Sequence, residues 1–286
     1  MYLQPRGENE IKAVKRMNCE VIDMHTHIYP SALARRAMRV TDRENEDSGK
    51  LPVLENLLAR MSEEHVAVSV VQPVVTKPAT QVDVNRFAAE VRRPNIVSFG
   101  GVHPDCGNVA EELEKLKDMR MAGVKFHPPY QRVHLEDEKY ADMWRQINRL
   151  RFPVLIHCGQ ARVEHTWDLF PSGVSRILKY LPDVPVILAH MGGRSKDPAE
   201  EKLLYTFPEN VFVDSAMSAE HQDIRDFERI AGNMRPERVI FGSDFPYGTQ
   251  KAAIAYIANS SFSDSEKAAM LGGNAKKILG ESIRTR

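Results

Sequence analysis

The chain has 286 residues, 42% of them hydrophobic, and its 39 Lys and Arg residues balance 39 Asp and Glu residues. This length and apolar content are typical of a globular protein with a sizeable core. A formal net charge of zero disfavours nucleic-acid and membrane-surface partners, which usually require a basic excess. No apolar run reaches the ~18 residues of a membrane span, and the polar stretch 1–18 does not resemble a signal peptide. These features predict a cytoplasmic protein.

Short apolar, β-branched runs predict eight strands along the chain. They begin at residues 21, 65, 95, 123, 153, 185, 210 and 238. After the first interval the starts lie 25 to 32 residues apart, and one strand with its returning helix takes about 30 residues. Most of the runs are continuously apolar, which is typical of strands that a parallel sheet buries on both faces.

Helical patterns fill the gaps between these runs. Residues 108–119 and 137–150 each carry one apolar stripe at helical spacing. Near the C-terminus, Ser263 and Glu266 form a capping-box pattern that predicts the start of a helix. The stretch "GGN" at 272–274 is expected to end that helix and to start another.

Eight strand–helix units predict an α/β fold, a single (β/α)8 TIM barrel over residues 1–286 with 1–19 as an N-terminal extension. The rival is a doubly wound open sheet, but the first turn lacks the Gly-x-Gly-x-x-Gly that a dinucleotide-binding sheet favours. Residues 31–50 form an insertion after the first strand. In a barrel this connection lies on the catalytic face, so the insertion is either a solvated loop or a lid.

Histidines gather at the carboxyl ends of the predicted strands. In "VIDMHTHIYP", His25 and His27 have the same parity, so both imidazoles project from one face, roughly 7 Å apart at Cα. Six of the ten histidines end five predicted strands: His25, His27, His103, His127, His157 and His190. Asp244 ends the eighth, in "FGSDFP". In a barrel these ends converge on one mouth, where active sites lie.

Imidazole nitrogens and carboxylate oxygens are the donors that zinc and its neighbours take. Three nitrogens and one oxygen from three strands would come from His25, His27, His157 and Asp244. A water bound to such a metal loses its proton near neutral pH and becomes a nucleophile. The carboxylate of Asp244 could also accept or deliver a proton. Asp23 shares the inward face, and we expect it to hydrogen-bond a ligating histidine.

The motifs "DMHTH", "VLIHCG", "ILAHMGG", "FGSDFP" and "GGNAKKIL" together resemble the amidohydrolase superfamily, and most closely its amidohydrolase 2 branch. The resemblance runs from about residue 20 to 281. It implies a TIM barrel of the metal-dependent hydrolase type, with one Zn²⁺ held by His25, His27, His157 and Asp244. It also implies catalytic roles for Asp244 and His190. It leaves open whether the metal is Mn²⁺ and whether a second metal is bound with His190 as a ligand. A homodimer is also possible in this family.

Four further residues are candidate contacts for a small-molecule substrate. Lys125 lies on the fourth predicted strand, where some superfamily members carry a carboxylated lysine that bridges two metals. A plain ammonium there could instead bind a substrate carboxylate or form a structural ion pair. His127 shares its face, His103 precedes a proline at another strand end, and Arg162 follows the fifth strand.

Two reactions fit this predicted site. The resemblance favours hydrolysis, in which a metal hydroxide attacks an amide, ester or lactone carbonyl. The same branch contains metal-dependent, non-oxidative decarboxylases of aromatic or unsaturated acids that use the same ligand set. Release of carbon dioxide distinguishes the two. A metal-binding protein without catalysis is a third interpretation, which the presence of His190 and Asp244 disfavours.

Overall fold

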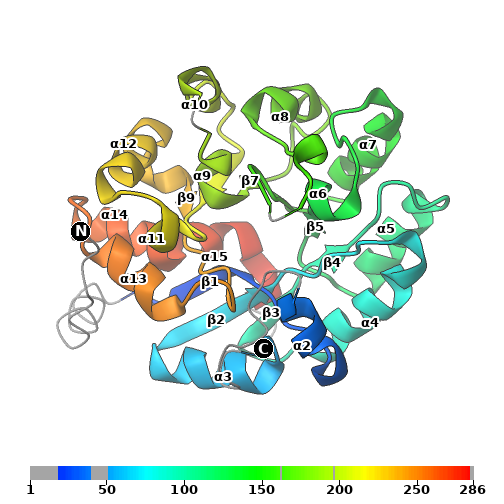
Figure 1. Cartoon of the computed structure of the whole chain (residues 1–286), viewed down its shortest axis with the longest axis horizontal. Coiled ribbons are helices and arrows are strands. Elements are labelled where there is room, and N and C mark those ends of the chain that lie inside the picture. Colours follow the sequence, from blue (N-terminus) through cyan, green and yellow to red (C-terminus); the bar gives the residue numbers. More distant parts are fainter. Residues whose placement is uncertain (1–18, 40–50, 162, 196, 284–286) are drawn as a thin grey trace. The chain divides into compact units, whose positions relative to one another are not determined.

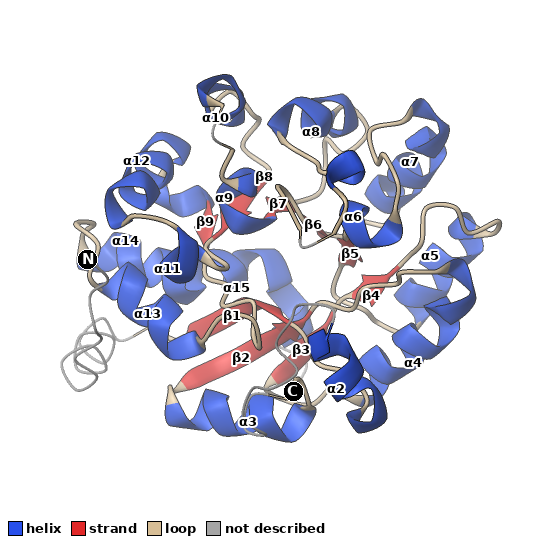
Figure 2. Cartoon of the chain, viewed as in Figure 1, coloured by secondary structure: helices blue, strands red, loops and turns tan. Residues whose placement is uncertain are grey.

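The computed structural model describes residues 19–39, 51–161, 163–195 and 197–283 (Figure 1). Its Cα positions divide into two compact units, one made of Met1–Val70 with Asp214–Arg286 and the other of Val71–Val213. Each unit is an alternation of strands and helices (Figure 2). The single-domain organisation expected from the sequence stays a prediction. Most of the expected N-terminal extension, and residues 40–50 of the expected insertion, lie outside the described residues.

In the first unit, the buried strand β1 (Val21–Thr26) lies between β2 (Val66–Val71) and the segment that follows β9 (Val239–Ile240). Its backbone donates hydrogen bonds from Met24 to Phe241 and from His27 to Phe245, at 3.0 and 2.7 Å. The helices of this unit are α2 (Ser31–Arg39), α3 (Leu54–Glu63), α11 (Ser218–His221), α12 (Ile224–Met234), α13 (Gln250–Ala258), α14 (Asp264–Ala268) and α15 (Asn274–Leu279).

In the second unit, parallel strands pair in chain order. They are β4 (Gly100–Gly101), β5 (Val124–Phe126), β6 (Val154–Ile156), β7 (Val186–Leu188) and β8 (Val211–Asp214), whose last residue belongs to the first unit. Strand β3 (Ile96–Ser98) also lies in this unit but belongs to a different sheet. The register from β5 to β8 places Val124, Val154, Val186 and Val211 side by side, all fully buried. The helices are α4 (Gln81–Glu90), α5 (Val109–Asp118), α6 (Pro128–Gln131), α7 (Ala141–Arg149), α8 (Pro171–Leu178), α9 (Ala189–Gly193) and α10 (Pro198–Leu204).

All eight predicted strand regions contain a strand, and parallel pairing confirms the predicted α/β class. The third region is split, because β3 and β4 are separated by Phe99. The two predicted helices correspond to α5 and to a 3₁₀ turn that leads into α7. Within the described ranges, every helix is too short or too polar to traverse a bilayer.

The C-terminal region follows the sequence pattern with one difference. Ser263 and Glu266 form the predicted capping box at the start of α14. Helix α15 begins at Asn274 as expected, but a π-helical turn over Ala269–Gly273 joins it to α14. A Cβ atom on Gly272 would collide with the backbone oxygen of Glu20. This glycine therefore allows the turn to pack directly against the chain that enters β1.

Candidate metal centre and active site

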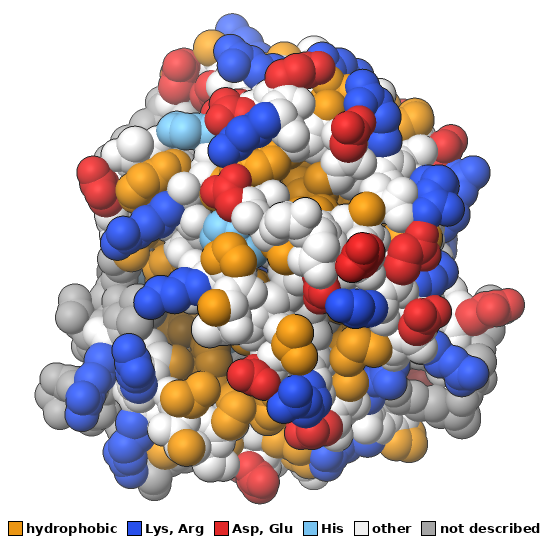
Figure 3. All heavy atoms as spheres, turned by 90° about the vertical axis from the view of Figure 1, so that its right-hand side faces the viewer, with side chains coloured by type: hydrophobic (Ala, Val, Ile, Leu, Met, Phe, Trp, Pro, Cys, Tyr) orange, Lys and Arg blue, Asp and Glu red, His pale blue; other side chains and the backbone are white. Residues whose placement is uncertain are grey.

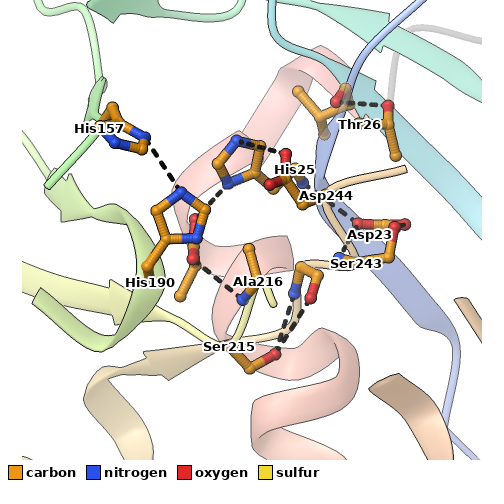
Figure 4. Close-up of polar contacts among 12 residues, drawn as sticks. Asp23, His25, Thr26, His157, His190, Ser215, Ala216, Ser243 and Asp244 are labelled. Carbon is orange, nitrogen blue, oxygen red and sulfur yellow. Dashed lines mark hydrogen bonds and ion pairs between the residues drawn. The ribbon is translucent and has the colours of Figure 1, made fainter. Parts of the chain in front are cut away.

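Three donor atoms converge at the carboxyl ends of β1 and β9. The Nε2 atoms of His25 and His27 lie 3.1 Å apart. Oδ1 of Asp244 lies 3.1 Å from Nε2 of His27 and 3.4 Å from Nε2 of His25. All three residues are buried, and Figure 4 shows His25 and Asp244 facing each other.

This triangle has the dimensions of a metal site. A metal about 2.0–2.2 Å from each donor places octahedral or tetrahedral donors about 2.9–3.5 Å apart. Two imidazole nitrogens and a carboxylate oxygen so close together are electron-rich atoms that need a cation between them. The cluster of His25, His27 and Asp244 therefore has the donors and the spacing to hold a divalent metal ion.

The imidazole of His25 is oriented by a carboxylate that sequence reasoning did not assign to it. Nδ1 of His25 lies 2.8 Å from Oδ2 of Asp214, and both residues are almost completely buried. A carboxylate accepts this hydrogen bond, so Nδ1 carries the proton and Nε2 of the neutral ring has its lone pair free for a metal. The only sequence signal was a polar residue ending a buried strand, in "VFVD".

Asp23 hydrogen-bonds His25 as expected, at 3.2 Å, but its other hydrogen bonds go to a different part of the chain. Its carboxylate accepts hydrogen bonds from the backbone N–H and hydroxyl of Ser243, at 3.0 and 2.6 Å, and from the side chain of Gln250 at 2.9 Å. It contacts His25 through the backbone N–H, not the imidazole. Burial raises the pKa of Asp23 to about 6, although these hydrogen bonds oppose the shift. Asp23 thus joins β1 to the segment before Asp244 (Figure 4).

The loop after β9 aims the third donor. Asp244 has a φ of 61°, which is unusual for a residue with a side chain. Its backbone N–H donates to the carbonyl of His25 at 2.8 Å, and its carbonyl accepts from Tyr247 at 2.8 Å. The Tyr247 ring lies 6.0 Å from that of His27. An aromatic side chain therefore stands beside the metal donors.

The second unit holds a group of aromatic rings in contact with one another. The imidazoles of His127 and His157 are nearly parallel, with centroids 3.9 Å apart, and Tyr130 stacks on the other side of His127 at 4.0 Å. Nδ1 of His157 lies 3.1 Å from Nε2 of His190 (Figure 4). Within this unit, the strand-end histidines His127, His157 and His190 therefore lie together, as their positions at neighbouring strand ends predict.

The turn after β7 has an unusual backbone. His190, Met191 and Arg194 have φ values of 58°, 54° and 49°, and Gly192 and Gly193 between them are also positive. Each non-glycine residue in this left-handed conformation costs about 1–2 kcal/mol. Such strain persists where the surrounding structure fixes it, and it is typical of functional sites. It determines how His190 leaves the end of its strand.

Two glycines let the turns after β6 and β7 touch. A Cβ on Gly193 would lie 2.6 Å from the backbone nitrogen of Gly159, and φ at Gly193 is 97°. We expect Gly193→Ala to destabilise the protein by about 2–3 kcal/mol, because backbone atoms cannot move aside as a flexible side chain can. Chemical denaturation at equilibrium measures this change.

Gly232→Ala is the matched control for that substitution. Gly232 lies in the last turn of α12, is exposed, and has no atom within 4 Å of the added Cβ. Alanine there is expected to raise stability by up to about 1 kcal/mol through helix propensity. Equal effects of the two substitutions would contradict the close approach of the two turns.

The remaining predicted site residues divide as follows. His103 accepts at Nδ1 from the backbone N–H of Asp105 and bonds through Nε2 to the carbonyl of Gln131, so both ring nitrogens hydrogen-bond to backbone groups. Burial lowers its pKa. Lys125 is almost completely buried on β5. Arg162 lies outside the described residues.

The structure brings together three of the four predicted metal ligands, His25, His27 and Asp244. The fourth, His157, belongs to the second unit, so its role as a ligand stays a prediction. The same holds for the catalytic role of His190 and for substrate binding by Lys125 and His127.

Comparison with solved structures defines the fold class. The chain superposes on an uncharacterized TIM-barrel protein from Bordetella bronchiseptica with a TM-score of 0.74, 17% identity, and coverage of 92% of this chain and 99% of that chain. It also superposes on a dihydroxybenzoic acid decarboxylase from Polaromonas sp., solved with manganese and the inhibitor 2-nitroresorcinol. The TM-score is 0.73 and the identity 17%, over 92% of this chain and 97% of that chain. The chain therefore has the predicted (β/α)8-barrel fold.

Comparison of sequences gives the family. The amidohydrolase family profile matches residues 22–280, and the chain belongs to this family. It is 24% identical to 6-methylsalicylic acid decarboxylase acuB of Aspergillus aculeatus, over 91% of this chain and 94% of that protein.

These likenesses correct the expected reaction. The sequence favoured a hydrolase, but the curated relative and the metal-containing neighbour are both decarboxylases, which are lyases. The hydrolase expectation is wrong for a physical reason. A metal held by histidines and a carboxylate serves either reaction, so the ligand motifs alone do not separate them.

Proposed function

We propose that this protein is a metal-dependent, non-oxidative decarboxylase of an aromatic carboxylic acid. The observation that carries the proposal is the buried triangle of His25, His27 and Asp244 donors, in a chain similar over nine-tenths of its length to a 6-methylsalicylic acid decarboxylase. A divalent ion at these donors would supply Lewis-acid stabilisation of negative charge on the oxygen atoms of the substrate.

The reaction needs a proton at one carbon atom. When the bond between ring and carboxylate breaks, carbon dioxide leaves and the electron pair remains on the ring carbon. A proton must reach that carbon to complete the product. We assign its delivery to Asp244, whose carboxylate would take up a proton from solvent and pass it to the ring carbon, because this group is held at the donor cluster by its own backbone contact with His25. The Tyr247 ring beside His27 would form one wall for an aromatic substrate.

A small, diffusible substrate also agrees with the surface. Figure 3 shows acidic and basic side chains interspersed over the face that it draws, with no broad field of one sign there. The formal net charge of the chain is zero. These features support the predicted small-molecule partner over a nucleic acid. Cytoplasmic location and a homodimer stay predictions.

The metal itself is the finer part of the proposal. Two imidazoles and a carboxylate suit both zinc, which the sequence resemblance favoured, and manganese, which the Polaromonas neighbour contains. Elemental analysis of the purified protein, followed by reloading of the metal-free protein with Zn²⁺ or Mn²⁺, would identify the active metal.

The function is tested by incubating the metal-loaded protein with 6-methylsalicylate and with dihydroxybenzoates. We expect carbon dioxide release, loss of activity with a chelator, and recovery on adding metal. In D₂O, deuterium should appear at the ring carbon that lost the carboxylate, a label that hydrolysis does not introduce. Absence of carbon dioxide across a panel of aromatic acids, with the metal bound, would overturn the proposal.

A further inference from the structure

We propose that Asp214 is a positioning residue of the metal centre, which holds the His25 imidazole in the tautomer and orientation that bind metal. The carboxylate of Asp214 and Nδ1 of His25 lie 2.8 Å apart, although 189 positions separate the two residues in the chain. The inference rests on the proposed metal-dependent function and assigns a role to a residue outside the ligand set.

The Asp214 carboxylate is itself fixed. Asp214 is the last residue of β8 and is completely buried. Its Oδ1 accepts a hydrogen bond from the backbone N–H of Ala216 at 3.1 Å, while Oδ2 faces His25. A rigid strand end therefore sets the position of the acceptor, which limits rotation of the imidazole.

The position of the proton decides which nitrogen can bind a metal. In a neutral imidazole one nitrogen carries hydrogen and the other has a lone pair. Because the Asp214 carboxylate accepts from Nδ1, Nε2 of His25 is the lone-pair nitrogen. This is the atom that lies 3.1 Å from Nε2 of His27 and 3.4 Å from Oδ1 of Asp244. The opposite tautomer would point an N–H bond into the metal position.

The backbone around the pair is shaped for this contact. A Cβ on Gly242 would lie 2.8 Å from Cβ of His25 and 3.6 Å from Cγ of Asp214. Gly242 is joined to Ser215, the neighbour of Asp214. The Ser215 hydroxyl donates to the Gly242 carbonyl at 3.3 Å and accepts from the Gly242 N–H at 3.2 Å. The missing side chain at position 242 thus lets the chain after β9 pack directly against the His25–Asp214 pair.

The test compares metal affinity in matched variants. Metal-free wild type, Asp214→Asn and Asp214→Ala are titrated with Zn²⁺ alone and with Mn²⁺ alone, in competition with a chelator of known affinity. Loss of an orienting partner of a metal-bound histidine typically weakens metal binding by about 10- to 100-fold, and we expect a loss in this range for Asp214→Asn. Asp168→Asn is the control, since it disrupts another Asp–His pair, with His165, outside the metal cluster.

A second measurement reads the tautomer directly. In the metal-free wild type, long-range ¹H–¹⁵N NMR of the imidazoles should show His25 protonated at Nδ1. In Asp214→Asn the Nε2-protonated form should appear, because an amide can donate to Nδ1 as well as accept from it. A folded Asp214→Asn with unchanged metal affinity would overturn the inference, as would a wild-type His25 protonated at Nε2. The wild-type spectrum decides even if the variants do not fold.

The outcomes separate this inference from the function on which it rests. A wild-type protein that binds neither metal overturns both. A wild type that binds metal but releases no carbon dioxide overturns the decarboxylase function and leaves the role of Asp214 in place. Carbon dioxide release together with undiminished metal binding by folded Asp214→Asn overturns only the role of Asp214.

Discussion

Asp244→Asn is expected to lower kcat for decarboxylation by about 10²- to 10⁴-fold, the usual contribution of a positioned acid or base. Asparagine has the same shape and keeps an oxygen atom that can bind the metal beside His25 and His27, so part of the metal affinity should remain. It has no carboxyl proton to deliver to the ring carbon. Turnover is measured under saturating metal, with metal content determined for each preparation, so that a loss of chemistry is separated from a loss of metal.

Asp142→Asn is the control for this substitution. Asp142 lies in the first turn of α7, with its side chain almost fully exposed in an ion pair with Arg145. Exposed pairs of this kind contribute little, so activity should be unchanged. Unaltered turnover in metal-loaded Asp244→Asn would remove Asp244 from the mechanism and leave it as a ligand alone.

His27→Ala is expected to abolish stoichiometric metal binding and, with it, activity. His27 is buried, and its Nε2 lies 3.1 Å from both of the other donor atoms, so it provides one corner of the triangle. With alanine, only two donors of the triangle remain. Protein metal sites usually have three or four protein ligands, so two donors are too few to retain the ion. Elemental analysis after dialysis against metal-free buffer measures the metal atoms retained per chain.

Replacement of a histidine elsewhere provides the comparison. His134 is half-exposed and near Glu136, away from the donor cluster in the chain and in the second unit. His134→Ala should retain the metal content of the wild type. If dialysed His27→Ala, folded by circular dichroism, keeps one metal per chain, the triangle is not the metal site.

Local sequence patterns were enough to predict the strands, the helices and the α/β class. Burial of a strand on both faces requires a continuous apolar run. The runs "VLI" in β6 and "VIL" in β7 therefore predict buried strands without knowledge of their neighbours. The capping box at Ser263 could also be predicted locally, because its partner Glu266 lies only three residues further along the chain. Strand parity also placed His25 and His27 on one face, and the end of the eighth strand supplied Asp244.

The contacts between polar groups that are distant in the sequence follow only from the folded arrangement of the strands. Asp23 lies within the buried strand β1 and Asp214 ends the buried strand β8, and nothing local distinguishes their roles. In the folded chain, Asp23 hydrogen-bonds Ser243, 220 positions away, and Asp214 hydrogen-bonds His25. Such partnerships depend on the register of strands far apart in the sequence, which periodicity does not encode. The motifs also do not identify the reaction, because one set of metal donors supports both hydrolysis and decarboxylation.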